Sequence, residues 1–488
     1  MNKLGYRPLG VLLLLLVIYF PLFLHLGKLP IAVWDESLFA LRALHLFQEG
    51  SYMYNFNYYQ DLPNHQNTKL PFTTFFQVLG YHLLGVNELA VRLPIVAIFL
   101  VSQGYLIYYF HKYFNTLWPG VLMMLILVAS NGFVQPHMLR TGDQDTAFAM
   151  YLVLGVLFFY NYVHFGKTGF LWAFVIAFLA ALLTKNLLAG IIGPGLLLYI
   201  ILEGKAGELL KKKNIYLALA VIIAVYGGTL WYFEIQQSGF IQRMWEYELM
   251  GRYSNIIEGH SGGPMYYFYE LMEGIPIFIY PAIFSLLILW EDRAPKHLKS
   301  LVLLLWCVSL SYAVIISMSE TKTMWYTAPL YPFTALLSGL SLWYVYKYYL
   351  IKKARSWKWV CAGLTIALYA IVYFNTVGSN FNPKPKPYEK GEKYGLFLKK
   401  LDRSHSEYTD FVIIDNNFGT SAFFYKEMYN RKDSKYNIQY QRTIEVEVGT
   451  RVMSCLNNVL HPIDQQYEFR VLEEYDGCQL IEVTGFKD

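Results

Sequence analysis

Four polar stretches interrupt a mostly apolar sequence, and each carries charged side chains that could take part in a reaction. They are Asp35–Glu36 with the loop that follows to Lys69, RTGDQD at 140–145, RYSNIIEGHSGGP at 252–264, and ETK at 320–322 with Tyr326 downstream. Carboxylates close to hydrocarbon usually face a cavity, a metal ion or a substrate, because an isolated charge is costly there. These stretches are the candidate functional regions of the chain.

Carboxylates together with separate cations suit a reaction in which an anionic leaving group departs while an acceptor loses a proton. A carboxylate near the acceptor can take that proton, and cations placed where negative charge develops lower the barrier. A phosphate ester on a lipid carrier fits this chemistry, and an aromatic content of 18% suits an amphiphilic ligand as well as lipid interfaces.

The sequence has no His/Cys spacing typical of a metal site. A divalent cation bound by carboxylates alone, at Asp35, Glu36 and Asp145, remains open, since oxygen ligands suit such ions. No other cofactor is predicted.

Each candidate carboxylate also has a purely structural interpretation. Asp35 and Glu36 can be the acidic first turn of an interfacial helix, where they favour the helix dipole. Asp143 and Asp145 can cap the helix that is expected to begin near Thr146.

The candidate lysine and histidine residues have structural interpretations as well. Lys69 can be an interface anchor whose ammonium group reaches the headgroups, and Lys185, in LLTKN, can end a helix in the same way. His260 lies in a Gly-rich loop, where a histidine is more often solvated than functional, although the nearby Arg252 favours a functional role.

Composition places these stretches in a membrane protein. The chain has 488 residues, of which 55% are hydrophobic and only 15% charged. These values exclude an ordinary water-soluble globule and predict a polytopic membrane protein. The net charge of +5 includes no basic block of the kind that binds nucleic acids.

About eleven membrane spans are expected, at roughly 20 residues each. The first, 9–26, follows Lys3 and Arg7 and lacks a small-residue cleavage site, so it is predicted to be retained and to start in the cytoplasm. Residues 71–85 are too short to span and predict a helix lying at the interface. The other spans are expected at 88–112, 117–134, 146–163, 169–184, 187–203, 214–232, 266–290, 300–318, 324–346 and 359–377.

Loop charges support this threading, because cytoplasmic loops are enriched in Lys and Arg. The loops assigned to the cytoplasm carry Lys112, Lys167, Lys205, Lys211, Lys212, Lys213, Arg293, Lys296, Lys299, Lys352, Lys353, Arg355 and Lys358. The opposite loops carry isolated cations, and all four polar stretches fall on that extracytoplasmic side.

The chain divides into a membrane module, 1–378, with a first extracytoplasmic loop at 28–88, and a C-terminal domain, 379–488. A linker, NPKPKPYEKGEK, precedes the polar tail. Within the tail, DFVIID, TIEVEV and CQLIEVTG predict strands and TSAFFYKEMYN predicts a helix, so a small extracytoplasmic α/β domain without a P-loop is expected. Cys455 and Cys478 can pair in an oxidising compartment, but their spacing leaves this open.

Seven ordered motifs resemble the polytopic GT-C glycosyltransferases that take a sugar from a polyprenyl phosphate. They are WDES at 34–37, TKLP at 68–71, GVNELAVRLP at 85–94, RTGDQDTAFAMYL at 140–152, LLTKN at 182–186, GRYSNIIEGHSGGPMYYF at 251–268 and TKTMWYTAPLYP at 321–332. The resemblance is to the bacterial aminoarabinose transferases of lipid A and to the related protein O-mannosyltransferases. It implies a GT-C membrane fold.

The resemblance also implies roles for the carboxylates. Asp35 matches the first-loop aspartate taken as the catalytic carboxylate, and Glu36 lies beside it. Asp145 matches the carboxylate of the second loop, and Asp143 is its near neighbour.

For the carrier phosphate, the resemblance implies four binding residues. Lys69 matches the lysine of the lysine-proline motif, Arg252 is similar to the arginine of the later long loop, and Lys322 and Tyr326 are similar to the lysine and tyrosine that precede the proline pair.

Two positions differ from the aminoarabinose transferases. Leu38 stands where those enzymes have an arginine after the acidic pair, and Thr68 stands where they have an acidic residue before the motif lysine. The resemblance therefore does not imply the same sugar or acceptor.

The resulting hypothesis is an inverting glycosyltransferase of a bacterial inner membrane. It would move a sugar from a polyprenyl (undecaprenyl) phosphate to a lipid A, glycan or protein acceptor on the extracytoplasmic face. One alternative is a lipid or lipid-linked sugar transporter, although the charges lie on one face rather than at the midplane and no inverted repeat is visible. The other is a noncatalytic scaffold, for which an alanine at Asp35 would have no effect.

Overall fold

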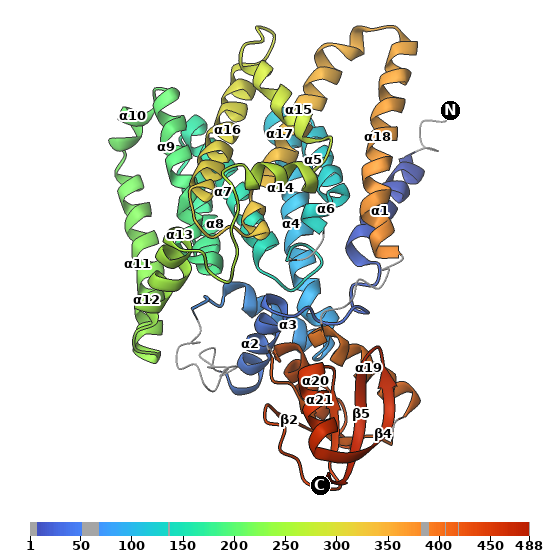
Figure 1. Ribbon diagram of the computed structural model, residues 1–488. Helices are drawn as coiled ribbons and strands as arrows, with labels where there is room; N and C mark the ends of the chain where they lie inside the picture. Colours follow the sequence, from blue (N-terminus) through green and yellow to red (C-terminus); the bar gives the residue numbers. More distant parts are fainter. Residues whose placement is uncertain are drawn as a thin grey trace.

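The computed structural model describes residues 7–50, 68–134, 137–381, 390–405, 407–417 and 419–487. The middle of the predicted first loop and most of the predicted linker lie outside these ranges. The described residues form a large helical part and a small domain with a sheet (Figure 1).

The helical part contains both long helices and short turns. Its α-helices are α1 (Arg7–Phe23), α2 (Asp35–Glu49), α3 (Phe72–Leu84), α4 (Glu88–Phe114), α5 (Trp118–Ala129), α6 (Asn131–Val134), α7 (Asp145–Phe165), α8 (Thr168–Lys185), α9 (Gly193–Leu202), α10 (Ala206–Leu210), α11 (Lys213–Gln236), α12 (Phe240–Arg243), α13 (Arg252–Ser254), α14 (Tyr266–Gly274), α15 (Ile279–Phe284), α16 (Lys296–Ser317), α17 (Leu330–Tyr348) and α18 (Arg355–Phe381). The tighter turns are the 3₁₀ helices η1 (Asn186–Ile192), η3 (Ser285–Leu289), η4 (Met324–Thr327) and η5 (Leu350–Lys352), and the π-helical η2 is Met244–Gly251.

Six helical segments among the described residues are long and apolar enough to cross a membrane. They are Glu88–Phe114, Asp145–Phe165, Thr168–Leu202, Lys213–Gln236, Lys296–Ser317 and Ser356–Gly378. The pair Tyr266–Gly274 and Ile279–Leu289, bent by 114°, adds a seventh if it is one span, and Leu12–Phe23 and Trp118–Ala129 are shorter apolar helices. The predicted polytopic helical membrane fold is confirmed.

The segment Thr168–Leu202 turns back on itself at η1. Lys185, at the end of α8, pairs with Asp145 at the start of α7. Tyr199, in α9, contacts His164 near the end of α7 and Ser300 near the start of α16. The end of α8 thus lies beside the start of α7, whereas the later part of α9 lies beside the end of α7. The chain therefore runs along α7 in one direction in α8 and in the opposite direction in α9, as the two separate spans predicted for 169–203 require.

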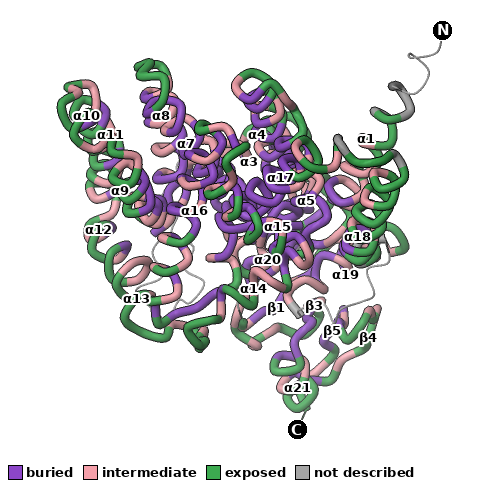
Figure 2. The backbone as a smooth tube through the Cα atoms, turned by 90° about the horizontal axis from the view of Figure 1, so that it is seen from above, coloured by how far each residue is buried: buried purple, intermediate pink, exposed green. Residues whose placement is uncertain are grey.

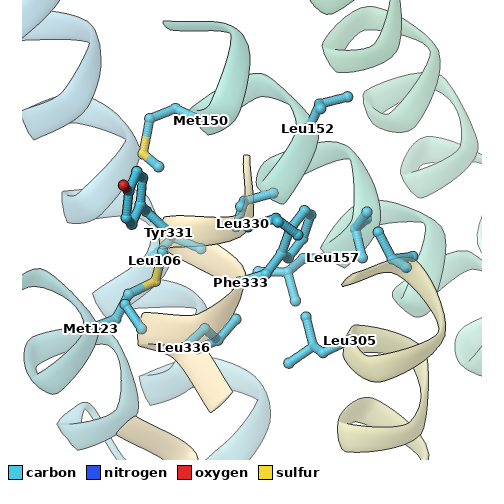
Figure 3. Close-up of a cluster of buried hydrophobic side chains, with 14 of the residues drawn as sticks. Leu106, Met123, Met150, Leu152, Leu157, Leu305, Leu330, Tyr331, Phe333 and Leu336 are labelled. Atoms are coloured by element: carbon cyan, nitrogen blue, oxygen red, sulfur yellow. The ribbon is translucent and has the colours of Figure 1, made fainter. Parts of the chain in front are cut away.

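The core of the helical part lies between α4, α5, α7, α16 and α17, each of which buries many of its residues, whereas α10, α11 and α18 lie at the periphery with many exposed residues (Figure 2). Side chains such as Met123, Leu157, Leu305 and Phe333 meet in this core (Figure 3). Helices that are apolar on every side bury one side here and offer the other to lipid. The most buried part of the frame therefore lies in the middle of the helical part.

The small domain contains a five-stranded mixed sheet. Its elements are α19 (Lys390–Ser404), β1 (Asp410–Ile414), α20 (Thr420–Lys432), β2 (Asn437–Gln441), β3 (Arg451–Ser454), α21 (Asn457–Gln466), β4 (Tyr467–Tyr475) and β5 (Cys478–Phe486). The strand order is β2-β1-β3-β5-β4; β1 is parallel to β2 and β3, whereas β5 is antiparallel to β3 and β4. Cys455 and Cys478 form a disulfide.

Three of the four elements predicted in the tail are present, and the strand predicted at TIEVEV is wrong. Residues 443–448 are irregular. Ile444 and Val446 do pack against a buried cluster, which explains their alternation. However, the Gln441 side chain, rather than a neighbouring strand, donates to the carbonyls of Thr443 and Glu445.

The small domain packs directly on the first polar loop of the helical part. The Tyr425 hydroxyl accepts the N–H of Ile31 at 2.8 Å and lies 2.8 Å from a carboxylate oxygen of Glu88. The hydroxyls of Ser37 and Thr420 are also hydrogen-bonded. Figure 1 shows α19 and α20 below α2 and α3. The C-terminal domain therefore forms part of the support of α2.

Candidate functional site

A buried ion pair fixes the start of α2. Arg92 Nε lies 2.7 Å from Glu36 Oε1 and Arg92 Nη2 lies 2.9 Å from Glu36 Oε2. Glu36 also accepts the N–H of Gly142 at 2.8 Å, and Gln77 donates to the Gly142 carbonyl at 2.8 Å. A Cβ on Gly142 would lie 2.3 Å from Val91 Cγ1, so this close approach requires glycine. Glu36, predicted as a supporting carboxylate, thus joins the first two polar stretches and acts as a positioning residue.

Glu36→Gln is expected to destabilise the protein strongly, because it leaves Arg92 buried without its counter-charge. Removing one partner of a buried ion pair costs about 3–5 kcal/mol. Chemical unfolding in detergent measures the loss. The control is Glu482→Gln, which removes the partner of Arg470, a side chain that is 69% exposed; an exposed pair contributes about 1 kcal/mol or less. Equal losses in the two variants would contradict this role.

Asp35 is the first residue of α2 and is partly exposed. Its carboxylate has no hydrogen bond or ion pair with the part of the chain that the structure describes. The preceding Trp34 has a φ of 74°, a conformation that is strained for any residue other than glycine. Glu36, which follows Asp35 in the sequence, is held by Arg92. Asp35 is therefore placed firmly by its neighbours while its own oxygens stay available.

The second polar stretch brings His137 next to Asp143, and this histidine was missed by the sequence analysis. His137 Nδ1 lies 3.2 Å from Asp143 Oδ2, which also accepts a hydrogen bond from the Thr141 hydroxyl at 2.9 Å. Trp325 packs on the His137 ring with centroids 4.5 Å apart. Burial lowers the pKa of His137, but Asp143 and, more weakly, Asp35 outweigh it and raise the pKa to about 9.

This shift predicts a pH-dependent stability. Because the folded-state pKa of His137 lies near 9, above the ordinary 6.5, the contribution of its cationic form is fully present below pH about 6.5 and is lost as the pH rises through about 9. His137→Gln is expected to flatten this decline. Melting temperatures in detergent between pH 6 and pH 10 test it, and an unchanged slope in the variant would contradict it.

Asp145 and Lys185 form the next charged pair. Asp145 is the first residue of α7, and Lys185 Nζ lies 2.5 Å from its Oδ1. Neither Asp143 nor Asp145 occupies the position before α7, which is held by Gln144 without a side-chain cap. Lys185 does end a helix, but its ammonium group points to a carboxylate rather than to the lipid interface.

Lys69 is paired with Glu248, a residue that the sequence analysis did not identify. Lys69 Nζ lies 2.8 Å from Glu248 Oε2, and the Thr68 hydroxyl donates to Oε1 at 2.7 Å. Burial raises the pKa of Glu248, but the charges of Lys69 and Arg252 outweigh it and lower the pKa to about 2. Glu248 is therefore an ionised anchor for the motif lysine.

Arg252 has donors that are free for a ligand. Its guanidinium lies 5.2 Å from the Tyr247 ring centroid and its Nη2 lies 4.0 Å from Glu258. Its Nε and Nη1 are buried and have no hydrogen-bond partner among the described residues. Tyr326 lies nearby: burial raises the pKa of Tyr326 to about 12, although Arg252 opposes the shift.

Lys322 and His260 are less available than predicted. Lys322 is buried, and its ammonium group donates to the carbonyls of Ser317 (3.0 Å) and Ser319 at the end of α16. The His260 carbonyl accepts the Lys322 N–H at 3.1 Å, and its ring lies 5.8 Å from Trp325. Both residues hold the later loops together, and Lys322 has one ammonium hydrogen left for a ligand.

The four polar stretches thus meet in two adjoining groups. The carboxylate group contains Asp35, Asp143 and Asp145 with His137 and Lys185, and the cationic group contains Lys69, Arg252, Tyr326 and Glu248. Tyr326 adjoins both groups, since the charges of Glu248 and Asp145 both act on its pKa. This arrangement can bind a phosphate beside a free carboxylate.

The predicted carboxylate set does not fit a shared cation. Glu36 is used by Arg92 and the Gly142 amide, and Asp145 by Lys185. Within the described ranges, no group of three or more His, Cys, Asp or Glu side chains could hold a metal ion.

Sequence comparisons found a family model and a related protein, each of which matches part of this chain. The family model described as dolichyl-phosphate-mannose-protein mannosyltransferase matches residues 67–232. An uncharacterized protein of Aquifex aeolicus (strain VF5) is 24% identical over 333 residues, which cover 67% of this chain and 62% of that protein. The chain thus matches less than two thirds of the length of that relative.

Solved structures match over more of the chain. ArnT from Cupriavidus metallidurans bound to undecaprenyl phosphate superposes with a TM-score of 0.71 at 16% identity, covering 99% of this chain and 98% of ArnT; the apo form gives 0.69 at 14%, with the same coverage. The oligosaccharyltransferase AglB from Archaeoglobus fulgidus gives 0.51 at 11%, covering 86% and 64%. Together with the motifs and the family-model match, these superpositions identify the fold of this chain as that of the GT-C glycosyltransferase superfamily, in its ArnT-like form.

Proposed function

We propose that this protein transfers a sugar, with inversion, from a polyprenyl-phosphate donor to a lipid, glycan or protein acceptor. The observation that carries the proposal is the Arg252 guanidinium, whose two buried donors lack partners among the described residues while Tyr326 and Lys69 lie close by. A phosphate oxygen would supply an acceptor that the described residues do not provide. The ArnT relative was crystallised with undecaprenyl phosphate, which supports the same carrier class here.

In this mechanism the acceptor hydroxyl attacks C1 of the sugar from the side opposite the phosphate. The bond between C1 and the phosphate oxygen breaks, and its electron pair leaves with the phosphate, while the hydroxyl proton passes to the Asp35 carboxylate. Arg252, Lys69 and Tyr326 stabilise the charge that develops on the phosphate, an effect that is strengthened by their burial.

Asp145 and Asp143 have supporting roles in this proposal. Lys185 Nζ lies 2.5 Å from Asp145 Oδ1, and His137 Nδ1 lies 3.2 Å from Asp143 Oδ2. Each pair places a basic side chain beside a carboxylate, so the second loop adds little net charge next to Asp35. Asp35, which has no such partner among the described residues, is the carboxylate best suited to take a proton.

The reaction is proposed to take place on the extracytoplasmic face of a bacterial inner membrane. The Cys455–Cys478 disulfide lies in the domain that packs on the first loop, and disulfides persist in oxidising compartments. Lysine-rich turns such as 211–213, between α10 and α11, lie at the opposite end from that domain (Figure 1), as the positive-inside rule requires.

Transfer from labelled polyprenyl-phosphate sugars to membrane extracts tests the proposal with the purified full-length protein. Label is expected in a new product, whose chemistry identifies the acceptor as a lipid, glycan or protein. Movement of the labelled lipid across reconstituted vesicles without product formation would instead support a transporter and overturn the proposal.

A further inference from the structure

A cavity with several cations in its lining lies outside the proposed transfer site. It has a volume of about 1070 Å³ and lies between the C-terminal domain and the turn that joins α3 to α4. Its lining includes Lys28, 85–88 and parts of α19 and α20. None of Asp35, Lys69, Asp145, Arg252 and Tyr326 belongs to this lining. We propose that this cavity binds the phosphate-bearing headgroup of a membrane lipid whose acyl chains lie along α3.

The cavity has a marked excess of positive charge. Six cations line it, against two carboxylates, Glu88 and Asp402. The cations are Lys28, Lys399, Lys400, Arg403, Arg431 and Lys432. Both carboxylates already have lysine partners, since Lys399 pairs with Glu88 and Lys432 with Asp402. The remaining cations are therefore uncompensated by the lining itself.

Three of these cations are available to an anion. Lys28 and Arg403 are exposed and form no ion pair with the described residues, and Arg431 makes only a 3.7 Å contact with Glu427. Lys400, in contrast, pairs with Glu473 at 3.0 Å. A phosphate group suits such a set, because several nearby donors can share its charge.

An apolar helix face adjoins the cationic cavity. Phe75, Leu79 and Leu83 follow one another at four-residue intervals on α3 and are 53%, 53% and 73% exposed. Spacing by four residues places them on one side of the helix. Leu84, at the end of α3, is itself part of the cavity lining. The apolar face and the charged cavity are therefore continuous.

This combination specifies an amphiphile rather than a soluble anion or a peptide. A helix with an exposed apolar face lies at the membrane interface, where cations attract anionic headgroups. The headgroup would occupy the cavity and the acyl chains the side of α3. Because the cavity wall comes from both parts of the protein, such a lipid would bridge the C-terminal domain and the helical part.

Lipid titration of the full-length protein in an uncharged detergent, followed by native mass spectrometry, tests the inference. The probes are phosphatidylglycerol, phosphatidylcholine and glycerol 3-phosphate. One phosphatidylglycerol is expected to bind tightly, with weaker binding of the other two. The triple variant Lys28→Gln, Arg403→Gln, Arg431→Gln is expected to bind it on the order of 100-fold more weakly, at about fivefold per cation.

The matched control is Lys435→Gln, Arg470→Gln, Lys487→Gln, which removes three exposed cations of the same domain from outside the cavity. It should bind as the unmodified protein does. Equal weakening in both triple variants, or in neither, would overturn the inference. Equal binding of glycerol 3-phosphate and phosphatidylglycerol would contradict the inference that the ligand is a lipid and would indicate a free phosphate ester instead.

A photoactivatable phosphatidylglycerol gives a readout in the unmodified protein, so that misfolding of a variant cannot decide the result. Cross-links are expected at 84–88 and in α19. Labelling confined to the outer faces of α11 and α18 would overturn the site. The double variant Leu79→Asn, Leu83→Asn should weaken binding of the lipid but not binding of glycerol 3-phosphate.

Discussion

Asp35→Asn is expected to lower kcat for sugar transfer by about 10²- to 10⁴-fold, the range that a positioned general base contributes. The amide retains the size of the side chain but cannot take the proton from the hydroxyl group of the acceptor substrate. Binding of the polyprenyl-phosphate donor should change little, because in the proposed mechanism Arg252, Lys69 and Tyr326 hold the phosphate. Steady-state transfer assays together with donor-binding measurements separate the two effects.

The control for this variant is Asp476→Asn, which makes the same chemical change in the turn between β4 and β5, where the side chain is 57% exposed. It should transfer at the original rate. If Asp35→Asn also transfers at that rate, Asp35 is not the base. If it loses donor binding together with turnover, its role is in the shape of the first loop.

Arg252→Gln is expected to weaken binding of the polyprenyl phosphate by about 10- to 100-fold or more, because a hydrogen bond to a charged group contributes about 1.5–3 kcal/mol. Turnover should also fall, since the phosphate becomes more negative as it leaves. Arg252→Lys should restore only part of the affinity, because a lysine keeps the charge but lacks the two-pronged geometry. Equilibrium binding of a labelled polyprenyl phosphate measures each step.

Arg293 provides a control with similar neighbours, although its side chain is 62% exposed and that of Arg252 is 12% exposed. Its guanidinium lies 5.5 Å from the Tyr349 ring centroid and 3.8 Å from Glu291, much as Arg252 lies over Tyr247 and near Glu258. Arg293→Gln therefore removes a similar stacked arginine from a region away from the site. Equal losses in both variants would contradict phosphate binding by Arg252.

The hydrophobic runs and polar interruptions of the sequence predict most of the fold. Runs near 20 residues can satisfy their backbone hydrogen bonds only as helices in lipid, so the helical spans follow from composition. The gathering of the four polar stretches also follows from the threading, because alternate loops share a membrane face. The alternation in TIEVEV was misleading, because a half-buried loop can show the same pattern as a strand.

The partners of the site residues could not be predicted in the same way. Glu248 is 179 positions from Lys69 in the sequence. His137 can be recognised as part of the site only from its contacts with Asp143 and Trp325. Arg92 carried a recognisable signal, because a charge within a membrane helix needs a partner, but its partner Glu36 had been predicted as a possible supporting residue or cation ligand. Such pairs depend on tertiary packing, which a single sequence does not reveal.

The contact between the C-terminal domain and α2 has a consequence for how the protein is made. Ile31 and Tyr425, which are hydrogen-bonded, are separated by 394 positions, and Ser37 and Thr420 by 383. The ribosome therefore releases α2 long before the residues that support it. Until α20 has been translated and folded, Asp35 lacks its final setting. A chain that stops early would leave a membrane module with an unfinished first loop, so the last segment to be synthesised completes the first.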